Sequence, residues 1–93
     1  MNDEQAMIET IEETTCVELG EIRTGMASMG TGPYVLPDGS TVEGMTGILA
    51  PEDQENVVIG MGSIVSVGGV RWEVVDVEKE RGIPGSITLK STA

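Results

Sequence analysis

The sequence predicts a mainly β protein, a small antiparallel barrel or curled sheet of about five or six short strands with an N-terminal α-helix. From Tyr34 onward, short runs of β-branched residues alternate with glycine- and proline-containing turns at hairpin spacing. No helical segments alternate with these runs, which argues against a parallel α/β sheet. The length of 93 residues predicts a single domain, residues 1–93.

The N-terminal helix is predicted over residues 2–15. Asn2 and Gln5 have the spacing of a capping box, and Ile8 and Ile11 begin a helical spacing of apolar residues. The β-branched residues that follow weaken this prediction. Residues 14–22 therefore either continue the helix or form a first strand.

Residues 23–33, RTGMASMGTGP, are predicted to be a flexible loop because glycine and small side chains leave little to fold. Met26 and Met29 are its large apolar groups. They either fold back into the core, which is the commoner outcome, or adapt to a partner.

The β domain is predicted over residues 34–90, followed by a tail at 91–93. Pro37 and Gly39 indicate a tight turn between a short strand and a longer one over 40–49. The change of phase between Val74 and Val75 predicts a bulge in the longest strand. Further strands are expected at 57–59, 64–67, 70–77 and 86–90, with a two-residue hairpin at Gly68-Gly69 and a loop at 78–85.

The composition indicates a modest core and an acidic surface. Trp72 and Tyr34 are the aromatic residues, so Trp72 is the expected core anchor, and the thin aliphatic core favours self-association. The formal net charge is −11, from 16 acidic and 5 basic residues. This balance disfavours nucleic-acid binding, although an acidic surface suits a protein that borders a DNA path. A solubility surface or a salt-adapted source explains the charge equally well.

The residue types do not assemble a catalytic set. Histidine is absent, and Cys16, the one cysteine, has no metal-binding or activating neighbour in the sequence. Cys16 is therefore expected to be a small buried residue. Residues 60–63 read as a turn, and the acidic residues 52–55 lack the ligand spacing of a calcium loop. We expect no enzyme activity, no cofactor and no metal.

The chain also lacks the sequence pattern of a secretory signal and any apolar run long enough to span a membrane. A soluble protein of a reducing compartment is expected, without membrane contact.

The loop Glu80-Arg81-Gly82-Ile83-Pro84-Gly85 places an isoleucine and a proline at a hairpin tip. An exposed apolar tip suggests docking to a partner. The alternative is that Ile83 folds back as a plug over one end of the barrel.

Residues 41–90 resemble a known family. The segments TVEGMTGILAPEDQEN and GSIVSVGGVRWEVVDVEKERGIPGSITLK are similar to the small head–tail joining (head-completion, or neck) proteins of long-tailed bacteriophages. The predicted N-terminal helix belongs more loosely to this resemblance. The sequence departs from the family pattern at residues 57–62, where family members commonly carry a longer stretch.

The resemblance implies a non-catalytic virion protein, assembled in the host cytoplasm, that forms a homo-oligomeric ring between the portal or its adaptor and the tail. It also implies ring-to-ring contacts by the chain ends and two loops, with DNA passing nearby but not specifically bound. The implied contact residues are Glu52, Asp53, Gln54 and Glu55 in one loop and Arg81, Gly82, Ile83, Pro84 and Gly85 in the other.

Three other functions remain open from the sequence. A capsid decoration protein or another minor tail component fits a small β-rich domain. A small cellular β-barrel that binds peptides needs an aromatic groove, for which two aromatic residues are poor material. An enzyme has no specific support.

Overall fold

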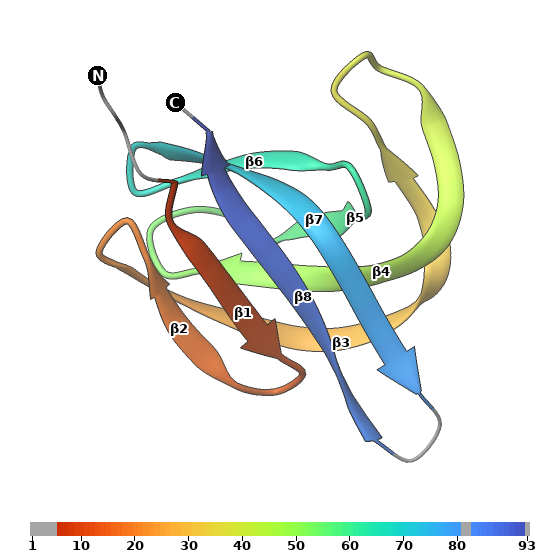
Figure 1. Cartoon of the computed structure of the whole chain (residues 1–93), viewed down its shortest axis with the longest axis horizontal. Helices are drawn as coiled ribbons and strands as arrows, with labels where there is room; N and C mark the ends of the chain where they lie inside the picture. The colour runs from red at the N-terminus through yellow and green to blue at the C-terminus, as the bar shows by residue number, and fades with distance from the viewer. Residues whose placement is uncertain (1–5, 81–82, 93) are drawn as a thin grey trace.

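The computed structural model, which describes residues 6–80 and 83–92, consists of β-strands joined by short turns (Figure 1). In the described part of the chain, eight strands form two four-stranded antiparallel sheets, and no helix is present. No helix there is accordingly long and apolar enough to cross a membrane. The strands are β1 (Ile8–Glu12), β2 (Cys16–Leu19), β3 (Ile22–Val35), β4 (Thr41–Pro51), β5 (Val57–Gly60), β6 (Ile64–Val67), β7 (Val70–Glu80) and β8 (Ile83–Thr92).

The two sheets are joined at two corners. One has the strand order β1-β8-β7-β6 and the other β2-β3-β4-β5. At the first corner, the turn from β1 to β2 bonds to β3, where the N–H of Thr14 donates to the carbonyl of Met26. At the second corner, the turn after β5 bonds to β7, where the N–H of Gly62 donates to the carbonyl of Val74. The chain thus passes between the sheets through tight turns.

A single apolar core lies between the sheets and receives side chains from all eight strands. Burying each large apolar side chain stabilises the fold by roughly 1.5–3 kcal/mol, so this core holds the two sheets together. Its buried members are Ile11, Leu19, Met26, Leu49, Ile59, Val65, Val67, Trp72, Val74, Ile87 and Leu89.

The predicted N-terminal helix over residues 2–15 is wrong. Residues 8–12 form β1 and pair with residues 86–90 of β8, and residues 16–19 form β2. A helix of this length is marginal without packing, whereas a β-branched segment suits a sheet edge, where pairing buries Ile11 completely. The capping pair Asn2 and Gln5 lies outside the described residues.

The predicted flexible loop over residues 23–33 is also wrong, because this segment is the middle of β3. It pairs with β4 from Thr24 to Val35, with one register shift between Met26 and Met29. Met26 is in the core, as the commoner reading expected. The far part of this long hairpin, residues 31–35 and 41–45, lies beyond the pairing with β5 and curls back beside the body as a two-stranded arm (Figure 1).

The antiparallel β prediction for the second half of the chain is confirmed, with longer strands than expected. The hairpin at Gly68-Gly69 joins β6 to β7, and the predicted bulge lies between Val74 and Asp76. The expected loop at 78–85 is largely strand, since β7 continues to Glu80 and β8 begins at Ile83. The additional strands β1 and β2 raise the count from the expected five or six to eight.

The first and last described strands lie side by side. The N–H of Met7 donates to Ser91 Oγ, and the N–H of Ser91 donates to the carbonyl of Met7, each at 2.8 Å. Two turns meet close to this corner. A Cβ on Gly20 would lie 2.9 Å from the carbonyl oxygen of Val67, and both Gly20 and Gly68 have left-handed backbone conformations. Glycine at these positions lets the two turns touch through their backbones.

Candidate functional site

The acidic loop 52–55 lies in the exposed turn between β4 and β5. All four residues, Glu52, Asp53, Gln54 and Glu55, face solvent. Glu52 approaches Arg23 at 4.0 Å, but both side chains are largely exposed, so solvent screens this ion pair. The loop is held at its start by a hydrogen bond from the N–H of Glu52 to the carbonyl of Arg23.

The predicted contact loop 80–85 lies at the hairpin end between β7 and β8. Ile83 is 55% exposed and Pro84 is also exposed, so Ile83 does not fold back as a plug. Gly85 is buried, and it packs so closely that a Cβ added there would lie 2.5 Å from Met29 Sδ. Arg81 and Gly82 lie outside the described residues. The structure does not bring this hairpin end together with the acidic loop 52–55, which lies on the opposite side of the molecule (Figure 1).

Trp72 and Cys16 differ in where they lie. Trp72 is 1% exposed within the core, and its indole Nε1 is buried without a hydrogen-bond partner in the described structure. Cys16, expected to be buried, is exposed at the start of β2, so that expectation is wrong. The reason is the strand alternation, which turns Cys16 outward while Leu19 of the same strand points into the core.

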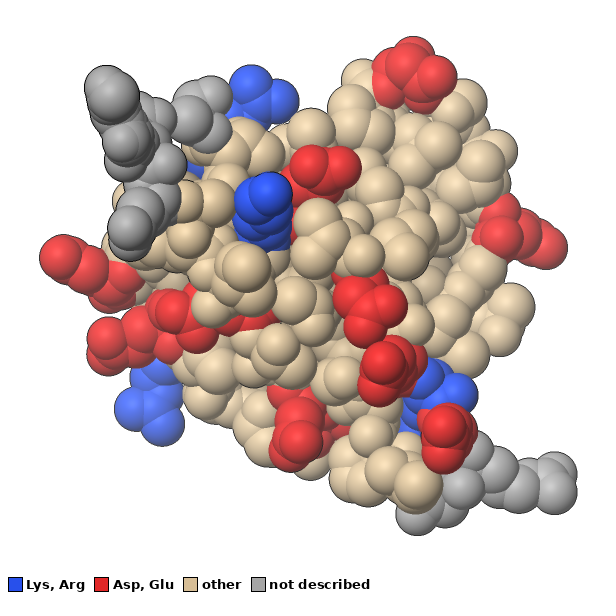
Figure 2. Space-filling view, in the orientation of Figure 1, with Lys and Arg blue, Asp and Glu red and all other residues tan. Residues whose placement is uncertain are grey.

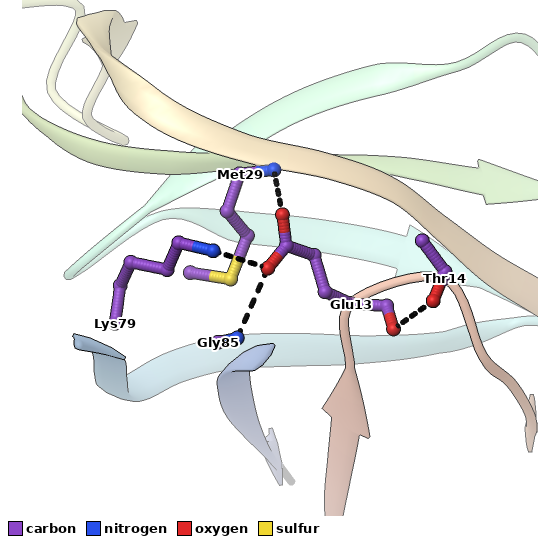
Figure 3. A network of polar contacts seen from close by, with 5 residues as sticks. All are labelled: Glu13, Thr14, Met29, Lys79 and Gly85. Atoms are coloured by element: carbon purple, nitrogen blue, oxygen red, sulfur yellow. Dashed lines mark hydrogen bonds and ion pairs between the residues drawn. The ribbon is translucent and has the colours of Figure 1, made fainter. Parts of the chain in front are cut away.

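Glu13 forms a polar network that the sequence did not reveal (Figure 3). Its Oε1 accepts hydrogen bonds from Lys79 Nζ at 2.5 Å and from the N–H of Gly85 at 3.0 Å, and its Oε2 accepts one from the N–H of Met29 at 3.2 Å. The network spans the β1–β2 turn, β3, β7 and β8. Because the partners lie 16 to 72 positions from Glu13 in the chain, no local pattern indicates this network.

The network stabilises the ionised form of Glu13. The hydrogen bond from Lys79, followed by that from Gly85, lowers the pKa of Glu13 from 4.5 to about 2. The carboxylate lies where pairing is irregular, at the register shift of β3 and near the one between Glu78 and Glu80. Glu13 therefore fastens together segments whose strand ladders are interrupted, which is a structural role.

Tyr34 fastens the β3–β4 arm to the rest of the protein. Its hydroxyl donates to the carbonyl of Met61 at 2.9 Å, and its ring covers Gly60, where a Cβ would lie 2.5 Å from the ring. Beside it lies an uncharged groove of about 440 Å³. The groove is lined by Pro33, Tyr34, Val35, Leu36, Pro37, Val57, Val58, Ile59, Ser63 and Ile64.

A second cavity, which we call the acidic cleft, lies where β1 begins, β2 ends and β6 turns into β7. It has a volume of about 520 Å³ and combines an apolar floor with three carboxylates. Its lining residues are Met7, Glu9, Glu18, Gly20, Glu21, Gly68, Val70 and Trp72. Such a site offers burial for an apolar group and attraction for a cation at the same place.

The outer face of β1, β8 and β7 is also acidic (Figure 2). The strand register sets Glu12 and Glu78 on either side of Ser86, and Lys90 between Ile8 and Glu73. Carboxylates consequently outnumber cations across this face, which leaves it a negative potential.

The described residues contain no group of three or more metal-ligating side chains close enough to hold an ion. Comparison of the chain with protein-family models, with curated proteins and with solved structures finds no match in any of the three. The described residues thus present four surfaces: an uncharged groove, an acidic cleft, an acidic sheet face and an exposed apolar hairpin end.

Proposed function

We propose that this chain is a structural protein of the neck of a long-tailed bacteriophage. In this role, identical copies form a ring that joins the DNA-filled head, through its portal or adaptor, to the tail. The protein acts by binding other proteins, without catalysis.

The observation that carries the proposal is the arrangement of residues 41–90, the part of the chain that resembles head–tail joining proteins. These residues form β4 to β8, an antiparallel framework in which Gly68-Gly69 of the motif make the hairpin turn between β6 and β7. The helical part of the resemblance is absent from the described residues, so it does not contribute. The framework carries an exposed hairpin end with Ile83 and Pro84, a feature suited to contact with a neighbouring protein.

The charge of the chain supports the same role. A net charge of −11 and an acidic outer sheet face repel a DNA backbone. A neck protein must let DNA pass without retaining it, and carboxylates facing that path meet this requirement. We further propose that the exposed residues 52–55 and 83–84 contact the neighbouring rings of the neck.

Co-expression with the portal and adaptor proteins encoded in the same genome tests this proposal. Native mass spectrometry and negative-stain electron microscopy are expected to show a ring of this protein bound to the portal–adaptor assembly. Immunogold labelling of virions is expected at one vertex. Label spread over the whole shell indicates a decoration protein instead, and a protein that neither oligomerises nor binds the portal assembly contradicts the proposal.

A further inference from the structure

Strand β6 is an open edge of its sheet. Among the described residues it pairs with β7 on one side and with no strand on the other. The N–H of Val74 in β7 donates to the carbonyl of Ser63, which fixes the phase of this ladder. Because the backbone groups of a strand alternate in direction, the odd-numbered residues of β6 face β7, and the N–H and C=O groups of Ile64 and Ser66 face away from it. The edge of β6 therefore presents a row of donors and acceptors to which no described residue supplies a partner.

The β6 edge also lacks charge. Residues 56–70, which contain β5 and β6, include no Asp, Glu, Lys or Arg, in a chain with 16 acidic and 5 basic residues. The edge strands β1 and β2, by contrast, carry Glu9, Glu12 and Glu18. Proteins commonly protect an exposed sheet edge with charged side chains or proline, and β6 has neither. Its composition is that of an edge that another strand covers.

Strand β5, the other uncharged edge, is partly closed by the chain itself. The N–H of Gly60 donates to Ser63 Oγ, and the carbonyl of Gly60 accepts the N–H of Ser63, each at 2.9 Å. The ring of Tyr34 also packs against Gly60. The edge of β6 is consequently the uncharged edge that remains open, and the uncharged groove, which Ile64 lines, extends this surface beyond the start of the strand.

The partner that this edge fits is a second copy of the same strand. When two β6 strands lie antiparallel about a two-fold axis at Val65, Ile64 of each copy lies opposite Ser66 of the other. Each outward N–H then meets an outward C=O, so the two edges satisfy one another. A chain with a net charge of −11 repels its own copies wherever their carboxylates meet, and an uncharged edge avoids that repulsion.

The charges beside β6 also match in this arrangement. On the exposed face of the sheet, Arg71 of β7 lies next to Ser66, and Glu73 lies next to Ile64. Each row of side chains across the joined strands therefore runs from Glu73 of one copy to Arg71 of the other. The row spans three strand spacings, about 14 Å between backbones, and the two long side chains shorten this gap. Arg71 forms no ion pair with a described residue, so it is available for this attraction.

We propose that two copies of this protein pair through the open edges of β6. Ile64 and Ser66 of one copy exchange backbone hydrogen bonds with Ser66 and Ile64 of the other. The two four-stranded sheets then form one continuous sheet, in the order β1-β8-β7-β6-β6-β7-β8-β1. The contact is isologous, so by itself it yields a pair of copies and neither a ring nor a filament. It is therefore a contact beyond those of the proposed neck ring.

Proline at position 66 tests the pairing. Ser66→Pro removes an N–H that points away from β7, so it blocks the outer edge of β6 and leaves the ladder between β6 and β7 in place. Sedimentation equilibrium is expected to show a dimer of the unchanged protein. For Ser66→Pro, the dissociation constant of this dimer is expected to rise by roughly tenfold or more.

Two controls separate the loss of the edge from other effects of substitution. Ser66→Ala removes the hydroxyl and keeps the N–H. Ile8→Pro removes an outward N–H from the edge of β1, since the carbonyl of Met7, one residue earlier, is the group that faces β8. Both variants are expected to dimerise with a dissociation constant within about threefold of that of the unchanged protein. Circular dichroism checks that every variant is folded.

Cross-linking tests the register without proline. In a Cys16→Ser background, which removes the exposed native thiol, Ile64→Cys and Ser66→Cys are prepared as separate proteins. Directly opposite Cβ atoms of an antiparallel pair lie about 5 Å apart, close enough for a disulfide after a small shift. On mild oxidation, the mixture of the two proteins is therefore expected to form a covalent dimer on a non-reducing gel. Either protein alone is expected to cross-link more slowly, because identical positions lie diagonally across the two-fold axis.

The outcomes separate this inference from the proposed function. The pairing is overturned by an unchanged protein that stays monomeric, by a folded Ser66→Pro variant that dimerises as before, or by a mixture that cross-links no faster than its components. Should Ser66→Pro fail to fold, the cross-linking result decides. These measurements use the protein alone and leave the binding of the portal assembly untouched. Failure to bind that assembly overturns the proposed function and leaves the pairing intact.

Discussion

Lys79 and Glu13, 66 positions apart in the chain, meet through a 2.5 Å hydrogen bond between the ammonium and the carboxylate. This contact joins the β1–β2 turn to the end of β7. Glu13 also accepts the N–H groups of Met29 and Gly85, so one side chain connects both sheets at the point where their ladders are irregular. These hydrogen bonds favour the ionised form of the Glu13 carboxylate.

Replacing Glu13 by glutamine is expected to alter the pH dependence of folding. The pKa of Glu13 is lowered to about 2 in the folded protein from 4.5, so its stabilising contribution is complete above about pH 4.5 and disappears as the pH falls through about 2. Urea unfolding at a series of pH values measures this. Glu13→Gln is expected to be less stable at pH 7 and to lose less stability between pH 4.5 and 2.

Glu12→Gln is the control for that prediction, since Glu12 is an exposed neighbour outside the network. Equal pH profiles for the Glu13→Gln variant and the unchanged protein would contradict the role given to the network.

Gly60→Ala is expected to loosen the β3–β4 arm. The added Cβ would lie 2.5 Å from the ring of Tyr34, and overpacking of this kind costs about 1–3 kcal/mol. Denaturant unfolding measures the loss. Gly32→Ala is the matched control in the same arm, because a Cβ there meets nothing within 4 Å. A loss at Gly60 no larger than the loss at Gly32 contradicts the packing described.

A comparison of Gly68→Ala with Gly69→Ala is expected to isolate the contact between the two turns. Both glycines have left-handed conformations, so alanine at either position costs about 1–2 kcal/mol. Only at Gly68 does the new Cβ collide with backbone, that of Gly20 and, at 2.9 Å, the carbonyl oxygen of Leu19. The melting temperature of Gly68→Ala should therefore fall further, and equal values would show that the turns do not touch.

The Cys16 thiol is expected to react in the folded protein. Its exposure on β2 predicts complete modification by a chromogenic disulfide reagent without denaturant. The rate should rise by no more than a few-fold in urea. Protection of the thiol until the protein unfolds would contradict the exposed placement.

The second half of the chain was predictable because its signals are local. A two-glycine turn at Gly68-Gly69 and a phase change at Val74-Val75 each fix the backbone within a few residues. The strands on either side of these two features could therefore be predicted from the sequence. The strand at 64–67 begins and ends where expected.

The first half was mispredicted because long-range pairing decides its structure. Ile8 and Ile11 fit a helical period, but residues 8–12 pair with residues 86–90 of β8. A short stretch of sequence cannot indicate a partner that lies so far away in the chain. The glycines of residues 23–33 resemble a loop, yet pairing with β4 keeps them extended. Likewise, the acidic cleft combines residues from β1, β2 and β7, so only the folded chain shows it.

The pair of hydrogen bonds between Met7 and Ser91 has a practical consequence for handling this protein. Whatever polypeptide precedes Met7 and follows Ser91 must leave from a shared corner, and Met7 itself borders the acidic cleft. A purification tag or fluorescent fusion attached before Met7 or after Ser91 would obstruct this corner and the acidic cleft beside it. Self-association of the protein should therefore be measured after such additions have been cleaved off.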